Sequence, residues 1–258
     1  MTKIPIYVIS IKNSPRKKNI EKELEKYNFS YIDAVVGADE DSKTIENINT
    51  QEWVKKRYGR ILSYGEIGCS LSHIKAYQEI IENNIEWAII FEDDIIIEKN
   101  IENLLNIDKK LLNKNTLYIL GAQQYLNSEK LIIKTKKESI KVDKDIIFYH
   151  TLYSSKYIYR TASYLINKDT AKKILDFTNH KFCIADDWYI FNKYKLFDKI
   201  YISNLIYHPE PINNQSTIEK ERSANFIKRS FIRTVLSSVK IKLRLAFKIF
   251  IERFYDKL

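Results

Sequence analysis

Cysteine, glycine and proline are scarce in this sequence, and each shortage excludes a class of protein. Two cysteines, Cys69 and Cys183, occur among 258 residues with no CxxC pair. Neither a zinc centre nor a disulfide framework is therefore expected, and a reducing compartment fits best. Five glycines and four prolines are too few for a collagen-like, glycine-rich or proline-rich chain.

Long apolar runs and an export signal are also missing. No stretch of about 18 apolar residues is free of charge, so a transmembrane helix is not predicted. Residues 1–11 lack the basic start, the long apolar stretch and the cleavage site that mark a signal peptide. We therefore expect a cytoplasmic protein.

The composition that remains is that of a packed domain. Hydrophobic residues make up 45% of the chain and aromatic residues 13%, far more than a disordered protein contains. Short apolar segments, each typical of a buried strand, alternate with helical patterns, which predicts an α/β sandwich. We expect strands at 6–11, 87–91, 117–120, 162–166 and 200–206, and helices at 19–27, at 74–81 after an N-cap at Ser70 or Ser72, and at 169–177.

Positive charge is concentrated in the last part of the chain. Residues 225–258 carry nine Lys or Arg and two acidic residues, a net of +7 out of the +10 of the whole sequence. Apolar residues recur there every three or four positions, which predicts a basic amphipathic helix. Such a helix suits an anionic membrane surface; a terminal helix docked on its own domain is the alternative. We expect a globular body at 1–222 and a membrane-associating tail at 223–258.

Three consecutive acids, Glu92, Asp93 and Asp94, directly follow the predicted strand at 87–91. Ligands of open α/β sheets bind at the carboxyl ends of the strands. Adjacent carboxylates repel one another unless a cation neutralises them, and oxygen ligands suit Mg²⁺ or Mn²⁺. We predict a metal site centred on Asp94, with Glu92 on the same face because side chains alternate along an extended chain. The alternative is a solvated acidic turn.

Several separated segments form a recognisable series. They are YVISI at 7–11 with Arg16, YIDAVVG at 31–37, GEIGCSLSH at 65–73, FEDD at 91–94, TASYLI at 161–166, ADDW at 185–188, and 209–216. Together they resemble glycosyltransferase family 25, which contains bacterial lipooligosaccharide galactosyltransferases and collagen galactosyltransferases. The resemblance covers about residues 4–222. It implies a GT-A-like, Rossmann-type fold, a UDP-hexose donor, Mn²⁺ or Mg²⁺, and inverting transfer of a hexose.

The resemblance places the GEIGCSLSH segment at 65–73 at the donor site. Arg16 is suited to pairing with a diphosphate, with a surface cation as the alternative. Asp33 is suited to holding ribose or uracil. Gly65 lies where a helix begins, and its alternative role is a tight turn. The full set of expected donor contacts is Ile9, Ser10, Arg16, Asp33, Gly65, Glu66, Ser72, His73, Glu92, Asp93 and Gln215, the last in a closing segment.

A second pair of carboxylates, Asp186 and Asp187, is a candidate for the base that takes the proton of the acceptor hydroxyl during inverting transfer. The alternative is a helix N-cap, and the two roles can be divided between the pair, with Asp187 preferred as the base. Trp188 is expected to stack on the acceptor sugar. His208 ends the last predicted strand and is expected to join Asp94 and Glu92 as a metal ligand.

These expectations combine into one function. We predict a metal-dependent inverting hexosyltransferase that moves galactose from UDP-galactose to a lipid-linked lipooligosaccharide, works at the cytoplasmic face of the inner membrane, and has no nucleic-acid partner. A glucosyltransferase is the alternative within the family. A metal-dependent phosphohydrolase and a non-enzymatic membrane or nucleic-acid binder are the alternatives outside it.

Overall fold

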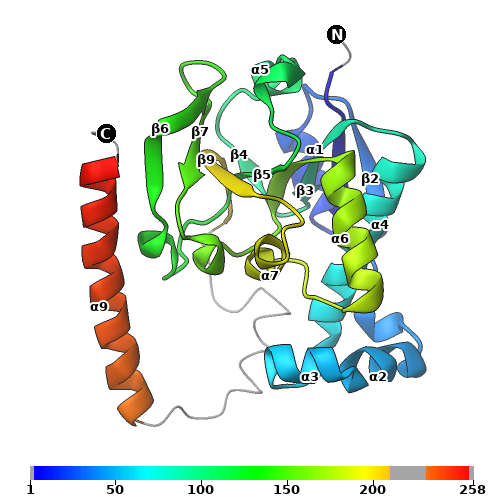
Figure 1. The fold of residues 1–258 in the computed structure, drawn as a ribbon. Coiled ribbons are helices and arrows are strands. Elements are labelled where there is room, and N and C mark those ends of the chain that lie inside the picture. Colours follow the sequence, from blue (N-terminus) through cyan, green and yellow to red (C-terminus); the bar gives the residue numbers. More distant parts are fainter. Residues whose placement is uncertain (1–2, 210–230, 256–258) are drawn as a thin grey trace.

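A mixed β-sheet lies at the centre of the protein (Figure 1). The computed structural model describes residues 3–209 and 231–255, with side chains in the last helix described from residue 240. Within these residues the strand order is β2-β1-β3-β8-β5-β9-β7-β6, and the short β4 pairs with β9. The strands are β1 Ile6–Ser10, β2 Phe29–Asp33, β3 Trp87–Glu92, β4 Ile96–Ile97, β5 Thr116–Gly121, β6 Lys134–Lys141, β7 Ile147–Thr151, β8 Ser163–Asn167 and β9 Lys199–Tyr207.

Helices cover both faces of this sheet. On one face, α4, α6 and α7 pack Tyr77, Ile174 and Trp188 against the strands. On the other face, α1 and α5 contribute Ile20 and Leu104. The predicted α/β sandwich is confirmed. The helices are α1 Lys17–Glu23, α2 Ser42–Thr50, α3 Glu52–Tyr58, α4 Tyr64–Glu82, α5 Glu102–Leu105, α6 Lys168–His180, α7 Trp188–Lys193 and α9 Phe231–Phe254.

One edge of the sheet collects the carboxyl ends of five strands. Strands β1, β2 and β3 are parallel. Strand β8 runs antiparallel to both β3 and β5, and β9 is parallel to β5. The last residues of β1, β2, β3, β5 and β9 therefore lie along the same edge, next to the start of β8. We call this the carboxyl edge.

Helix α4 begins earlier than the apolar pattern predicts. The hydroxyl of Ser63 accepts a hydrogen bond from the Glu66 N–H at 3.2 Å, and the Glu66 carboxylate accepts one from the Ser63 N–H at 3.1 Å. This reciprocal capping box starts the helix at Tyr64, so the predicted cap at Ser70 or Ser72 is wrong. The helix ends where predicted, with Asn83 as its C-cap.

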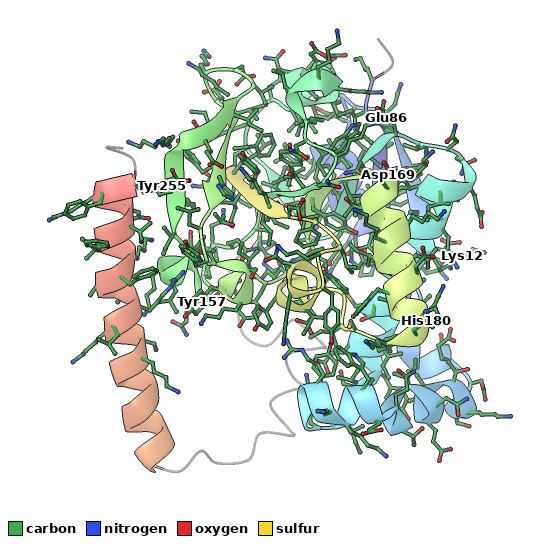
Figure 2. The ribbon with its side chains drawn as sticks, viewed as in Figure 1. Lys12, Glu86, Tyr157, Asp169, His180 and Tyr255 are labelled. Atoms are coloured by element: carbon green, nitrogen blue, oxygen red, sulfur yellow. The ribbon has the colours of Figure 1, made fainter. Side chains whose placement is uncertain are left out.

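The C-terminal helix, α9, is present and docks beside β6 (Figure 1). Arg244 donates hydrogen bonds to the carbonyl oxygens of Leu131 at 3.3 Å and Tyr153 at 2.9 Å. Near the other end of the contact, the Tyr255 hydroxyl donates to Glu138 in β6 at 3.2 Å (Figure 2). The helix is held through polar groups, so the alternative of a docked terminal helix describes its position.

The boundary expected between residues 222 and 223 lies outside the described residues, and so does Gln215. Among the residues that are described, no helix is both long enough and apolar enough to cross a membrane.

Gly121 allows the end of β9 to lie directly against the end of β5. Its φ is 151°, and a Cβ atom there would stand 2.0 Å from the carbonyl oxygen of Ile206. The N–H of Ala122 donates to that same oxygen at 2.7 Å. Since β9 ends one residue later at Tyr207, this close approach brings His208 to the carboxyl edge.

Replacing Gly121 by Ala is expected to destabilise the protein more than replacing Gly59 by Ala. Both glycines have positive φ, but a Cβ at Gly59 meets nothing within 4 Å. We expect Gly121→Ala to lower the free energy of unfolding in urea by about 2 kcal/mol more than Gly59→Ala, because backbone atoms must move apart. Equal losses in the two variants would contradict this role of Gly121.

Candidate active site

Asp94 is the residue of the acidic series with an unsatisfied oxygen. Its Oδ2 lies 3.0 Å from the guanidinium of Arg16 and 3.6 Å from Nε2 of His208. Its Oδ1 is buried and has no hydrogen-bond partner among the described residues. Burial and the charge of Glu92 raise the pKa of the Asp94 carboxyl above its ordinary value, although His208 and Arg16 oppose the rise. A buried oxygen without a donor is the feature expected of a cation ligand.

Glu92 is held on its inner side by two side chains. Nε2 of His73 lies 3.3 Å from Oε1, and the Thr161 hydroxyl donates to the same oxygen at 2.5 Å. The other ring nitrogen of His73 is 2.7 Å from the Tyr164 hydroxyl. Burial acts to raise the pKa of Glu92, but these hydrogen bonds and the nearby His208 lower it on balance. Glu92 is therefore kept as a carboxylate in a fixed position.

Asp93 points toward β1 and away from this pair. The hydroxyl of Ser10 donates to its Oδ2 at 2.6 Å, and Arg16 lies 3.5 Å from Oδ1. Arg16 thus bridges Asp93 and Asp94 with a side chain that is 44% exposed. His208 acts on both Glu92 and Asp94, whereas the Ser10 hydroxyl binds Asp93, which agrees with the predicted alternation of the three side chains.

Two overlapping sets of side chains on this edge could hold a metal ion. The first is the set expected from the sequence, Asp94, Glu92 and His208, which offers mainly oxygen and suits Mn²⁺ or Mg²⁺. Nε2 of His208 lies 3.6 Å from Oδ2 of Asp94, but among the described residues these three are not a group whose ligand atoms all lie within 4.8 Å of one another. The second is Cys69, His73 and Glu92, whose ligand atoms lie within 4.8 Å of one another. The thiol and imidazole of the second set suit softer metals. The unpartnered Asp94 oxygen belongs to the first set, so the residues present fit a hard divalent cation.

The predicted donor residues on α4 serve mainly to hold the fold. Glu66, which is 2% exposed, forms a bidentate ion pair with Arg60 with both distances at 2.6 Å. The hydroxyl of Ser72 accepts from the Val35 N–H at 2.8 Å and is also 2% exposed. These positions do not support the predicted donor contacts for the Glu66 and Ser72 side chains. Gly65 lies in the first turn of α4 and is half-buried.

The remaining predicted donor residues lie on or near the carboxyl edge. Asp33 ends β2, is exposed, and pairs in register with Ser10 at the end of β1. Ile9 is 6% exposed, so its side chain is part of the core, and it pairs with Ile32 of β2 and Glu92 of β3. His73 is 1% exposed and reaches the site through Glu92.

Asp186 and Asp187 differ sharply in their surroundings. Asp187 accepts two hydrogen bonds from Arg57, at 2.9 and 2.8 Å, and one from the Tyr58 hydroxyl at 2.9 Å. It also caps α7 through the Ile190 N–H. Asp186 is half-buried, and its Oδ2 accepts from the Arg160 N–H at 3.0 Å. The N-cap role anticipated for one member of the pair belongs to Asp187.

Trp188 does not face the site. Its side chain is fully buried, and its Nε1 donates to the carbonyl oxygen of Arg160 at 3.1 Å. The prediction that this ring stacks on an acceptor sugar is wrong, because the ring packs on Tyr164 and Phe191 inside the core.

The sequence reasoning missed several residues that shape this edge. Arg57 and Tyr58 come from α3, which no pattern predicted, and they reach Asp187 across about 130 positions of sequence. Thr161 has no predicted role beyond its place in the TASYLI segment, yet it orients Glu92. Arg160 adopts φ 65° and donates to the carbonyl oxygens of Ala122 and Gln124. A positive φ outside glycine marks strain that often accompanies function, but it has no sequence signal.

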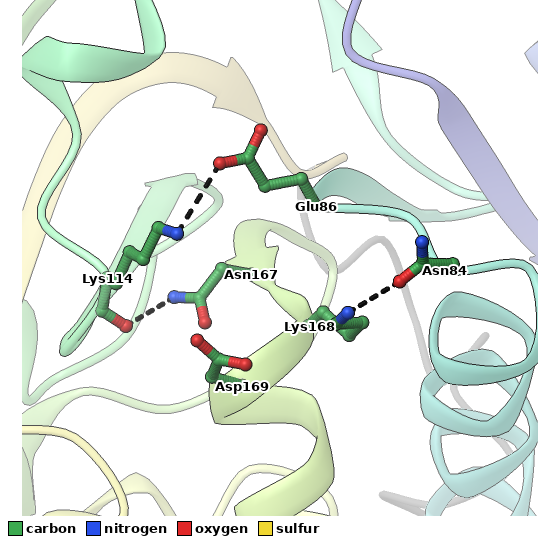
Figure 3. A pocket seen from close by; sticks show the side chains of 6 residues that line it. All are labelled: Asn84, Glu86, Lys114, Asn167, Lys168 and Asp169. Carbon is green, nitrogen blue, oxygen red and sulfur yellow. Dashed lines mark hydrogen bonds and ion pairs between the residues drawn. The ribbon is translucent and has the colours of Figure 1, made fainter.

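A separate hollow of about 320 Å³ lies at the opposite end of β3 (Figure 3). Glu86, Lys114 and Asp169 are among the residues that line it. Glu86 and Glu92 stand at the two ends of a six-residue strand, about 20 Å apart by the rise of an extended chain. This hollow is therefore distinct from the carboxylates of the carboxyl edge.

The sequence is similar to curated proteins of Haemophilus influenzae. A putative glycosyltransferase is 29% identical over 219 residues, covering 79% of this chain and 72% of the relative. The lipooligosaccharide biosynthesis protein lex-1 is 31% identical over 189 residues, covering 67% of this chain and 59% of the relative. The lipooligosaccharide biosynthesis protein lic2B is 25% identical over 258 residues, covering 90% and 89%.

Solved structures resemble the chain more distantly. A glycosyltransferase involved in glycosylation of the major capsid of PBCV-1 is 12% identical, with a TM-score of 0.40, over 85% of this chain and 98% of that one. The assignment therefore depends on sequence. The family model described as glycosyltransferase family 25 (LPS biosynthesis protein) matches residues 3–190. With this match across most of its length, the chain belongs to glycosyltransferase family 25.

Proposed function

We propose that the protein is a divalent-cation-dependent, inverting hexosyltransferase that uses UDP-galactose as its donor. The observation that carries this proposal is the buried, unpartnered Oδ1 of Asp94 beside Glu92 and His208. A buried carboxylate oxygen needs a donor or a cation, and these three residues are the expected ligands of Mn²⁺ or Mg²⁺. When bound, such a cation offsets the charge of the departing diphosphate.

The donor is expected to lie along the ends of β1, β2 and β3. Arg16, with its side chain 44% exposed, stands over Asp93 and Asp94 and is placed to pair with a phosphate oxygen as well. Asp33 and the backbone at Ile9 and Ser10 are proposed to face the nucleoside. Galactose as the sugar follows from the resemblance to family galactosyltransferases, with glucose as the alternative.

Asp186 is the proposed base, in place of the earlier preference for Asp187. Both oxygens of Asp187 are engaged by Arg57, and one also accepts from Tyr58, which suits a structural carboxylate. In the proposed reaction Asp186 takes the proton of the acceptor hydroxyl. The hydroxyl oxygen bonds to C1 of the hexose from the face opposite the diphosphate, and the C1–O bond to UDP breaks with its electron pair leaving on UDP.

The proposed acceptor is a lipooligosaccharide at the cytoplasmic face of the inner membrane, because two relatives are named for lipooligosaccharide biosynthesis. Helix α9 supports contact with an anionic bilayer. Leu243, Phe250 and Phe254 are 66%, 55% and 55% exposed, and their spacing places them on one side of a helix. Lys240 and Arg253 are exposed on the same helix, which complements anionic headgroups.

Asp94→Asn is expected to lower Mn²⁺-stimulated UDP release from UDP-galactose by at least about 100-fold, close to 3 kcal/mol of barrier. Thermal unfolding should stay near that of wild type, because the variant removes a charge from a site that is costly to ionise. Glu98→Gln, an exposed acid four residues away, is the matched control and should retain activity. If the wild-type enzyme turns over its donor equally well with and without Mn²⁺ or Mg²⁺, the proposed metal dependence is contradicted.

Asp186→Asn and Asp187→Asn should separate chemistry from structure. Asp186→Asn is expected to lower the transfer rate by roughly 100-fold or more with little change in unfolding temperature. Asp187→Asn should lower the free energy of unfolding by roughly 2–3 kcal/mol, because it weakens the pair with Arg57. Transfer assays and urea titrations on both variants test this, and a fully active Asp186→Asn enzyme would return the base role to Asp187.

Replacing Phe250 and Phe254 together by Glu should weaken binding to anionic vesicles. Co-sedimentation with phosphatidylglycerol vesicles is expected to fall at least about tenfold in partition coefficient, since apolar area is lost and charge becomes repulsive. Leu111→Glu, at an equally exposed apolar side chain away from α9, is the control. Unchanged vesicle binding by the double variant would contradict the proposed membrane contact of α9.

A further inference from the structure

Two partly exposed tyrosines belong to the two segments that meet at Asp186. Tyr159 is 44% exposed and Tyr189 is 37% exposed. Tyr159 immediately precedes Arg160, whose N–H donates to Asp186 at 3.0 Å. Tyr189 immediately follows Trp188, whose Nε1 donates to the Arg160 carbonyl at 3.1 Å. Two hydrogen bonds therefore tie the segment that carries Tyr159 to the segment that carries Asp186 and Tyr189.

The segment that carries Tyr159 is fixed in place from the end of β5. The Gln123 side chain, which is 4% exposed, accepts from the Tyr159 N–H at 3.1 Å and donates to the Tyr159 carbonyl oxygen. Arg160 follows in a left-handed conformation with φ 65°, and its guanidinium donates to the carbonyl oxygens of Ala122 and Gln124. A backbone held in such a conformation by surrounding bonds indicates that the position of this segment matters.

Tyr189 is held from another side. It lies in the first turn of α7, and Cζ of Arg57 stands 5.7 Å from the centre of its ring. Arg57 is itself fixed by its bidentate pair with Asp187. The same arginine therefore orders Asp187 and supports the ring of Tyr189, so the ring keeps its position without a bound ligand.

The hydroxyl of Tyr159 lies in a negative environment. Burial first, and then the charges of Asp186 and Asp187, raise the pKa of Tyr159. The phenol thus keeps its proton at neutral pH and is able to donate a hydrogen bond. Aromatic rings that carry a polar group suit ligands with both apolar C–H faces and hydroxyls.

We propose that Tyr159 and Tyr189 form the platform on which the acceptor sugar lies, with its reacting hydroxyl directed at Asp186. This inference rests on the proposed transferase function. It assigns to two exposed rings the stacking role that the buried Trp188 cannot perform. The ligand is a pyranose at the end of an oligosaccharide, recognised by its apolar face through stacking and by a hydroxyl through Tyr159. Gln123 and Arg160 act as positioning residues.

The test compares two activities of the full chain with UDP-galactose and Mn²⁺. One is UDP release without acceptor, and the other is transfer to O-deacylated lipooligosaccharide. Tyr159→Ala and Tyr189→Ala are each expected to raise the KM for the acceptor about tenfold, with acceptor-free UDP release within about twofold of wild type. Tyr189→Phe should restore the wild-type KM because it keeps the ring. Tyr153→Ala, which removes a 72% exposed ring earlier in the same segment, is the control.

The outcomes separate this inference from the proposed function. If both alanine variants keep the turnover rate and the acceptor KM of the wild type, the platform is overturned and the proposed transferase function stands. Loss of acceptor-free UDP release equal to the loss of transfer would also overturn it, since the damage would then be general. Absence of UDP release from UDP-galactose and UDP-glucose by the wild type would overturn the proposed function itself.

Discussion

Repulsion among carboxylates crowded at the end of a buried strand is the constraint on which the site depends. The apolar strand β3 delivers three acids in succession to the carboxyl edge, where neighbouring strands leave little water to screen them. Several elements supply the partners of these acids, and Arg16 is shared by Asp93 and Asp94, so each carboxylate has a positive or hydrogen-bonding neighbour. The partners are Ser10 at the end of β1, Arg16 after β1, His73 on α4, Thr161 before β8 and His208 after β9.

The two carboxylates of the second pair, Asp186 and Asp187, have different roles. Asp187 has a structural role, since it caps α7 and binds Arg57. That anchoring leaves its neighbour Asp186 at the edge with a backbone hydrogen bond from Arg160. Asp187 thus orders the local chain, and this order determines the position of Asp186. Adjacent identical residues can therefore have separate duties when the backbone turns between them.

The sequence predicts the fold class, five of the nine strands of the described residues and the acidic series after β3, because each leaves a local mark. The run before Glu92 is apolar at every position, and this marks a buried strand whatever surrounds it. Side-chain direction leaves no such mark. Trp188 and Tyr189 are both aromatic neighbours of an acid, and only packing decides which ring is covered. Contacts such as that of Arg57 with Asp187 join distant segments, so the sequence of neither segment predicts them.

The direction of the His208 side chain depends on the register of β9 with its neighbouring strands. Ile96, two residues after Asp94, pairs with Tyr207, and Gly121 pairs with Ile206. Strand β9 is therefore paired with a strand on each side just before His208. Successive side chains of a strand point to opposite faces. Deleting or inserting one residue within β9 would turn the imidazole to the reverse face of the sheet even if every apolar contact were regained. Descendants of this gene can exchange the apolar side chains of β9 for one another far more readily than they can change its length.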